Sequence, residues 1–99
     1  MSKPTLPSPA ERNAAMAALP DWAYNPKERA IHRSFTFADF NTAFAFMTEV
    51  ARLAEEANHH PDWSNSWNRV EIALTTHEAG GVTARDIALA RSITLLAGP

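Results

Sequence analysis

The sequence of 99 residues contains no cysteine. A disulfide framework, a thiolate nucleophile and a cysteine-ligated metal site are therefore excluded. No apolar run approaches the roughly 18–20 residues that a membrane-spanning helix needs. The first residues, Met1 to Pro4, also lack the apolar core of a signal peptide. We therefore expect a cytoplasmic protein that makes no contact with a membrane.

Positive charge is not in excess, since the formal net charge at pH 7 is −2. Because surfaces that coat nucleic acids are normally basic, we expect no direct contact with nucleic acid. The sequence also lacks the glycine motifs of dinucleotide-binding folds and P-loops, and the Gly-x-Ser-x-Gly motif of serine hydrolases. No motif therefore indicates a nucleotide cofactor or a serine nucleophile.

The length allows one domain with a single hydrophobic core. Hydrophobic residues make up 45% of the sequence, which is ordinary for a globular chain and argues against disorder. Residues 1–7, with two prolines and few apolar side chains, are expected to form a disordered tail before a folded domain over residues 8–99. A domain this small is often stabilised by oligomerisation.

Three capping signals predict the starts of three helices. The first helix should run to Leu19, where Pro20 stops it. The second should run from Phe37 to Ala57, and the third should end at Gly98. The signals are Ser8-Pro9-Ala10-Glu11, Thr36-Phe37-Ala38-Asp39 and Thr83-Ala84-Arg85-Asp86.

The second predicted helix carries apolar side chains at three- and four-residue steps. Packing against a sheet requires that period, so we interpret the stripe as core rather than as a cofactor site. Asn58 should end this helix, and Pro61 prevents its resumption. The stripe consists of Phe37, Phe40, Phe44, Met47, Val50 or Ala51, and Ala54.

Four segments are typical of β-strands, namely residues 22–24, 30–36, 63–67 and 70–77. The last is the clearest, because Val70, Ile72 and Leu74 share one face and His77 lies on the other. The connections are short, which favours antiparallel pairing. We therefore predict an α+β single domain of order α-β-β-α-β-β-α, with a four-stranded antiparallel sheet and helices packed on one face. Two further face assignments are Ile31 with Phe35, and Trp63 with Asn65 and Trp67.

Three of the four histidines lie between Glu55 and Asp86. His59 and His60 follow the end of the long helix, and His77 is expected at a strand end. Histidine is well suited to proton transfer near neutral pH, although ordinary exposed or hydrogen-bonded loop histidines would explain the same pattern.

Two alternatives for this stretch remain open. His59, His60 and His77 with Glu55 could ligate a metal, but no His-x-His or His-x-x-x-His spacing is present. Asp86 could cap the last helix or orient a histidine. Arg85 is readily explained as a first-turn surface residue.

The spacing of these residues resembles the signature of the pterin-4a-carbinolamine dehydratase family, also known as the dimerization cofactor of a homeodomain transcription factor. The signature residues are Glu55-x3-His59-His60-Pro61, Trp67, His77 and Asp86. The resemblance extends from Trp22 to Leu96 and includes Phe37 to Met47, Thr76-His77-Glu78 and Arg85-Asp86-Ile87. One departure is Asn58, where animal members often have Asp.

The resemblance implies a lyase that needs no cofactor or metal. It would remove water from 4a-hydroxytetrahydropterin to give quinonoid dihydropterin, and so recycle tetrahydropterin for aromatic amino-acid hydroxylases. His59, His60 and His77 would be catalytic, with His59 and His77 as the proton-transfer pair and His60 mainly orienting. The other implied site residues are Asn58, Thr75, Thr76 and Glu78 around the pterin, and Glu55, Trp63, Arg85 and Asp86 as supporting residues.

The resemblance also implies self-assembly, since family members pair edge to edge into dimers and some pair again through helices into tetramers. An alternative function is a non-catalytic regulatory module that acts through its oligomerisation helix, with Leu89, Ile93 and Leu96 as candidate contacts. A link to molybdopterin metabolism rests on family analogy only.

Overall fold

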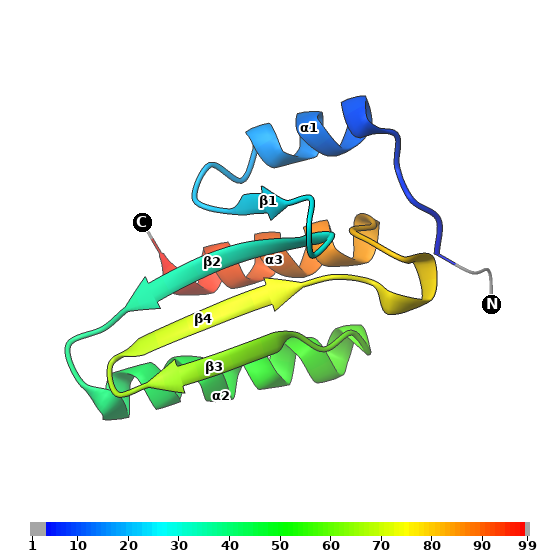
Figure 1. The fold of residues 1–99 in the computed structure, drawn as a ribbon. Helices are drawn as coiled ribbons and strands as arrows, with labels where there is room; N and C mark the ends of the chain where they lie inside the picture. The colour runs from blue at the N-terminus through cyan, green and yellow to red at the C-terminus, as the bar shows by residue number, and fades with distance from the viewer. Residues whose placement is uncertain (1–3, 99) are drawn as a thin grey trace.

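The computed structural model describes residues 4–98. The predicted order of helices and strands is confirmed, while residues 1–3 of the predicted tail lie outside the described residues. Figure 1 shows the elements: α1 (Pro9–Ala17), β1 (Ala23–Asn25), β2 (Ala30–Thr36), α2 (Phe40–Ala57), β3 (Asp62–Ser66), β4 (Arg69–Leu74), the 3₁₀ turn η1 (His77–Ala79) and α3 (Ala84–Ala97).

The four strands form one antiparallel sheet in the order β1-β2-β4-β3. Helices α2 and α3 lie against the same face of this sheet, and α1 lies beside the β1 edge (Figure 1). None of the residues of α1 is buried, and only Met16 of this helix packs against the core. The main core is therefore a two-layer arrangement of the sheet against α2 and α3.

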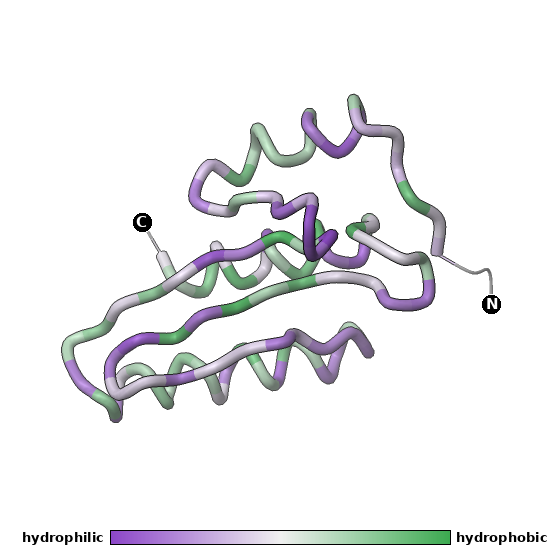
Figure 2. The backbone as a smooth tube through the Cα atoms, in the orientation of Figure 1, coloured by the Kyte–Doolittle hydropathy of each residue, from purple (hydrophilic) through white to green (hydrophobic). Residues whose placement is uncertain are grey.

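The core confirms the predicted alternation in the two central strands. Ile31 pairs with Leu74 and Phe35 pairs with Val70 across β2 and β4, and all four side chains are buried. Figure 2 shows polar positions alternating with hydrophobic ones along β4, whereas β3 remains pale or polar throughout. The central strands therefore hold the helices, and β3 forms a polar free edge. The helices contribute Ala43, Phe46, Val50 and Ala54 from α2, and Leu89, Ala90 and Ile93 from α3.

The predicted apolar stripe of α2 was wrong at the start of the helix. Phe40 and Phe44 are 44% and 53% exposed, whereas Ala43 and Phe46 face the core. The helix starts at Phe40, because the Asp39 carboxylate caps it by accepting from the Thr42 N–H at 2.8 Å. Apolar residues at three- and four-residue steps define two neighbouring faces of this helix, and the periodicity does not say which face is buried. The path of the loop that enters the helix decides which face packs against the sheet.

The β3–β4 hairpin also differs from the prediction. Trp67 was expected on β3 but lies in the turn, with a left-handed φ of 49° and an exposed ring. The Asn65 amide stabilises this turn by donating to the carbonyls of Trp67 and Arg69. These side-chain hydrogen bonds take the place of the backbone hydrogen bonds between β3 and β4 that a longer β3 would make.

Strand β4 ends at Leu74 rather than at His77. The chain turns instead at Thr76, whose backbone pairs with Gly81 through an N–H···O contact of 2.9 Å. His77 consequently begins η1 and does not belong to a strand. Gly80 ends this turn in the left-handed region, with φ of 78°, where glycine is unstrained.

The surface face suggested for α3 was wrong for two of its three residues. Leu89 and Ile93 are buried in the core, and only Leu96 is exposed. Within residues 4–98, none of the helices combines the length and the apolarity needed to cross a bilayer.

Candidate active site

The end of α2 turns the two adjacent histidines in opposite directions. Asn58 caps the helix in the left-handed conformation, with φ of 50°, and the His59 N–H donates to the Ala54 carbonyl at 3.0 Å. This confirms the predicted helix end. The reversal buries the His59 side chain and leaves that of His60 exposed, with 58% of its surface open.

His59 contacts Asp86 across the fold. Its Nε2 lies 2.5 Å from Asp86 Oδ1, and the Asp86 side chain is 0% exposed. A buried carboxylate is costly unless charged or polar partners surround it. Asp86 therefore does more than cap α3: it joins the start of that helix to the histidine after α2.

Two threonines complete the surroundings of Asp86. The Thr76 hydroxyl donates to Asp86 Oδ2 at 2.7 Å, and the Thr83 N–H donates to the same oxygen at 2.8 Å. The Thr76 and Thr83 hydroxyl oxygens are 2.7 Å apart. Since Thr76 uses its only proton on Asp86, the Thr83 hydroxyl must donate to Thr76.

This hydrogen-bond pattern also assigns the His59 tautomer. Asp86 accepts from both threonines, so an ionised carboxylate would accept a third proton from His59 Nε2. Nδ1 is then left to accept a proton from a bound molecule. The pair thus resembles the oriented histidine–carboxylate pairs that stabilise an imidazolium.

The other two histidines of the stretch have exposed carboxylate partners. His60 Nε2 lies 2.8 Å from Glu55 Oε2. His77 Nε2 lies 3.7 Å from Asp62 Oδ2, with the two side chains 82% and 68% exposed. Such pairs are solvated and hold their side chains weakly.

The three histidines line one cavity of about 230 Å³, which we call the histidine pocket. Arg85 and Glu78 also line it, with Arg85 Nη1 lying 3.9 Å from Glu78 Oε1. Glu55 and Asp86 contact lining histidines without lining the cavity themselves. The lining residues are Asn58, His59, His60, Thr75, Thr76, His77, Glu78 and Arg85.

Trp63, which the resemblance implies as a supporting residue, is outside this lining set. It pairs with Ile72 across β3 and β4 and packs, partly buried, against the core. Thr83 was not selected as a site residue, although its position as a helix cap was recognised. The capping box of Thr83 and Asp86 is confirmed, and because Asp86 was already selected as a supporting residue, this box is the signal that could have added Thr83.

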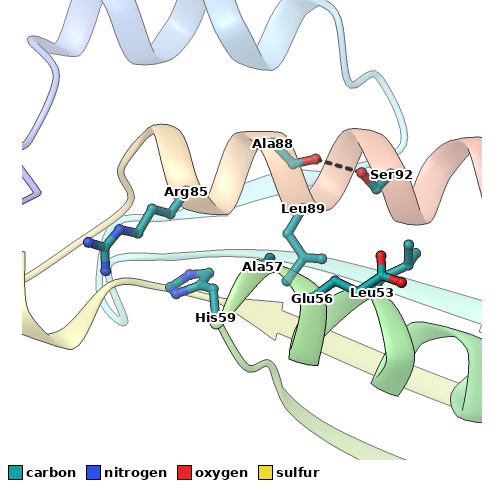
Figure 3. A pocket seen from close by; sticks show the side chains of 8 residues that line it. All are labelled: Leu53, Glu56, Ala57, His59, Arg85, Ala88, Leu89 and Ser92. Carbon is teal, nitrogen blue, oxygen red and sulfur yellow. Dashed lines mark hydrogen bonds between the residues drawn. The ribbon is translucent and has the colours of Figure 1, made fainter.

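A second cavity of about 400 Å³ adjoins the histidine pocket, because His59 and Arg85 line both. We call it the α2–α3 groove (Figure 3). Sequence reasoning missed it, since the two helices that form it are far apart in the chain. It is lined by Leu53, Glu56, Ala57, His59, Arg85, Ala88, Leu89 and Ser92.

The alternative metal site is not assembled. Among residues 4–98, no three histidine, aspartate or glutamate side chains are grouped so that they could hold a metal ion. Asp86 already occupies His59 Nε2, and Glu55 contacts His60 alone among the three histidines of the stretch. The arrangement is suited instead to moving protons between imidazoles and a bound molecule.

Comparison with protein families gives one matching model, described as pterin 4 alpha carbinolamine dehydratase, over residues 5–96. A protein of Rhizorhabdus wittichii, named "Putative pterin-4-alpha-carbinolamine dehydratase", is 61% identical over 87 residues, covering 88% of this chain and 90% of that protein. A protein of the same name from Burkholderia ambifaria is 55% identical over 83 residues, covering 84% and 81%.

Two solved structures share the fold. A transcriptional coactivator/pterin dehydratase from Brucella melitensis is 46% identical, with a TM-score of 0.89 over 93% of this chain and 98% of that chain. A pterin dehydratase-like protein identified as a RuBisCO assembly factor in the alpha-carboxysome is 26% identical, with a TM-score of 0.68 over 79% and 90%.

Proposed function

Because the chain belongs to the pterin-4a-carbinolamine dehydratase family, we propose that it dehydrates 4a-hydroxytetrahydropterin to quinonoid dihydropterin by histidine acid–base catalysis. The observation that carries the proposal is the histidine pocket, where His59, His60 and His77 from two distant segments line one cavity. The family relationship identifies the substrate class, and the pocket supplies groups that can move the protons.

The reaction needs an acid and a base. The acid protonates the hydroxyl on carbon 4a, the carbon–oxygen bond breaks and water leaves. The base removes a proton from the adjacent ring nitrogen, and the electron pair freed there forms the carbon–nitrogen double bond of the product. Each positioned acid or base is typically worth about 10² to 10⁴ in rate.

We assign the base to His59 and the acid to His77. Asp86 holds His59 through Nε2, so Nδ1 can accept the nitrogen proton, and the buried carboxylate stabilises the imidazolium that results. His77 reaches the pocket from the exposed η1 turn and can adjust to the leaving oxygen. His60 orients the substrate, with Glu55 as its partner.

The remaining lining residues bind and position the pterin. Thr75, Glu78 and Asn58 present polar groups to the cavity, as a ring rich in donors and acceptors requires. Arg85 lies beside Glu78 at the junction with the α2–α3 groove. After a separate two-electron reduction to tetrahydropterin, the product would again serve aromatic amino-acid hydroxylases in the cytoplasm.

A stopped-flow dehydration assay with purified protein tests the proposal directly. We expect a rate well above the spontaneous reaction, and the same rate with and without a metal chelator. A rate equal to that of the buffer alone would refute the dehydratase. A rate abolished by the chelator would return the assignment to metal chemistry.

We also propose that the protein self-associates. The free polar edge of β3 supports pairing of sheets, and the exposed rings of Phe40 and Phe44, 5.6 Å apart on α2, support contact through helices. Sedimentation should therefore give a dimer or a tetramer. Phe40→Ser with Phe44→Ser should reduce a tetramer to a dimer, whereas a monomeric wild-type protein would refute the assembly.

The exposed α2 rings also favour a second candidate function, a regulatory binding module. In this alternative, α2 contacts either a second copy of this chain or a different partner protein. Helix α3 cannot make such contacts through Leu89 and Ile93, because both side chains are buried in the core. A partner captured in stoichiometric amount, together with no turnover, would favour the module over the enzyme.

A further inference from the structure

A third cavity, of about 220 Å³, lies where α1 and β1 meet the loop between η1 and α3. Figure 1 shows the segment before α1 running down to this loop. We call it the Arg12–Arg29 cavity, after the two charged residues of its lining. It shares no lining residue with the histidine pocket or the α2–α3 groove.

The charge of the Arg12–Arg29 cavity is positive, because no acidic residue lines it. Within residues 4–98, neither of its arginines forms an ion pair with a carboxylate, whereas four other arginines do. The paired arginines are Arg33 with Asp21, Arg52 with Glu49 and Glu56, Arg69 with Glu71, and Arg85 with Glu78.

The carboxylates next to these arginines in the sequence have other partners. Glu11 Oε1 accepts from the Ser8 N–H at 2.9 Å, as part of the capping box of α1. Glu28 Oε2 lies 2.8 Å from His32 Nε2. Neither carboxylate lines the cavity, so the positive charge of the two guanidinium groups is left for a ligand.

The Arg12 side chain is half-buried and held in place without a counter-charge. Its guanidinium carbon lies 3.9 Å from the centre of the Tyr24 ring, which is a cation–π contact. Its Nε is shielded from solvent and has no hydrogen-bond partner among residues 4–98. Because a shielded cation without a counter-charge is unfavourable, a bound anion would stabilise this side chain.

Arg29 reaches the cavity from the start of β2. Its backbone has a left-handed φ of 55°, and its carbonyl accepts from the Thr75 hydroxyl at 2.7 Å. A methyl group at Gly81 would lie 3.8 Å from Arg29 Cβ and 3.0 Å from Leu6 Cδ2. The missing side chain of Gly81 therefore leaves room between Arg29 and Leu6.

We propose that the Arg12–Arg29 cavity binds the phosphate group of a small phosphorylated molecule. Arg12 and Arg29 supply the charged donors, since a guanidinium matches the oxygens of a phosphate in pairs. Leu6 and Val82 line the same cavity and supply an apolar surface for the carbon atoms attached to the phosphate. The volume is below the roughly 300–1,000 Å³ of sites for larger ligands, so a short substituent fits best.

A nuclear magnetic resonance titration of the full chain with inorganic phosphate, at constant ionic strength, tests the site directly. The side-chain Nε–H signals of Arg12 and Arg29 should shift and saturate with one dissociation constant. The signal of Arg91, which is exposed on α3 and outside the cavity, should not move. Absent shifts, or equal shifts of all three signals, would overturn the proposal.

Replacing each arginine tests the two donors separately. Arg12→Gln and Arg29→Gln should each raise the dissociation constant for phosphate by about tenfold, which corresponds to about 1.4 kcal/mol. Arg91→Gln is the matched control, because it removes the same charge from an exposed position, and it should leave the constant unchanged.

Equal weakening in all three variants would overturn the site. Circular dichroism checks the fold of each variant. If Arg12→Gln unfolds because the contact with Tyr24 is lost, Arg29→Gln decides the test, since the Arg29 side chain is exposed.

Two further probes identify the source of the phosphate. Propyl phosphate should bind more tightly than inorganic phosphate, and Leu6→Ser should remove that difference. Equal binding of the two probes by the wild-type protein would indicate an adventitious ion only. Sedimentation of the protein with vesicles that contain phosphatidic acid, lost in Arg29→Gln, would identify a membrane phosphate and overturn the small molecule.

Arg85 is the competing cation, because it lines both the histidine pocket and the α2–α3 groove. A saturating, non-reacting 7,8-dihydropterin should leave the dissociation constant for phosphate unchanged, and so should Arg85→Gln. A change in either experiment would assign the anion to the histidine pocket and overturn the proposal. Phosphate binding at Arg12 and Arg29 without dehydration would refute the proposed activity alone, and dehydration without phosphate binding would refute this site alone.

Discussion

Two histidine–carboxylate pairs of the same pocket differ in burial. His59 and Asp86 are 9% and 0% exposed and 2.5 Å apart, and two threonines complete the hydrogen bonds of the carboxylate. His77 and Asp62 are solvated and 3.7 Å apart. The first pair is held by three segments of the chain, while the second can move with the turn that carries it.

This difference supports the roles that we propose for the two histidines. A fixed histidine suits a base that must meet one ring nitrogen, because orientation lowers the entropy lost at the transition state. A mobile histidine suits an acid that follows a leaving oxygen. A third pair, the half-buried His32 with the exposed Glu28 at 2.8 Å, lies outside the pocket and serves as a control.

The largest effect should come from removing the histidines of both pairs. His59→Ala together with His77→Ala should lower the dehydration rate by about 10⁴ or more, because an acid and a base are lost. His32→Ala should retain the wild-type rate. Stopped-flow kinetics measure the rates, and circular dichroism checks the fold. Wild-type rates in the double variant would refute both assignments.

Removing the two carboxylates compares the pairs by stability. Asp86→Ala should lower the free energy of unfolding by about 3–5 kcal/mol, because it leaves a buried histidine and two threonines without their partner. Asp62→Ala should cost less than about 1 kcal/mol, since its pair is solvated. Urea unfolding measures both values, and equal losses would contradict the contrast in burial.

A single hydroxyl deletion gives a smaller effect. Thr76→Val keeps the shape of the side chain but removes one donor to Asp86, which should cost about 1–3 kcal/mol. Thr48→Val is the control, because its hydroxyl contacts only the Phe44 carbonyl on an exposed helix surface. The Thr76 variant should also lower kcat if the network positions His59, whereas a purely structural hydroxyl would change stability alone.

The smallest effect on stability is expected from Asp39, an exposed carboxylate that has no histidine partner and caps α2 instead. The hydrogen bonds of Asp39 with the backbone and the hydroxyl of Thr42 lower the pKa of the Asp39 carboxyl. Since the pKa is lower in the folded state, this cap stabilises the protein above the unfolded pKa, near about 3.9, and the benefit is lost as the pH falls through the folded pKa.

Asp39→Ala should therefore lower Tm by a few degrees at pH 7, and the difference from the wild-type protein should shrink in acid. Thermal unfolding followed by circular dichroism at a series of pH values measures it. A difference that grows as the pH falls would contradict the sign of the linkage.

Several features follow from local sequence and were predicted correctly. Ser8 with Glu11 and Thr83 with Asp86 form capping boxes, because a cap depends on residues three positions apart. The faces of β2 and β4 follow from a period of two residues. The family resemblance selected all eight residues that line the histidine pocket.

Other features depend on distant contacts and were not predicted. The two stripes of α2 have the same period, so the choice between Phe44 and Phe46 for the core needed the position of the sheet. Trp63 and Trp67 are both aromatic residues of one strand signal, yet one packs inward and the other lies in a turn.

Local pattern thus established the helices, the central strands and the presence of three histidines with acid–base potential. The folded arrangement established which histidine is buried, since Asp86 contacts His59 from 27 residues away and is itself held by Thr76, which lies 10 residues before it. It also created the α2–α3 groove, whose walls are separate helices. Spacing along a chain specifies local hydrogen bonds, but burial and cavities depend on surfaces that meet only after folding.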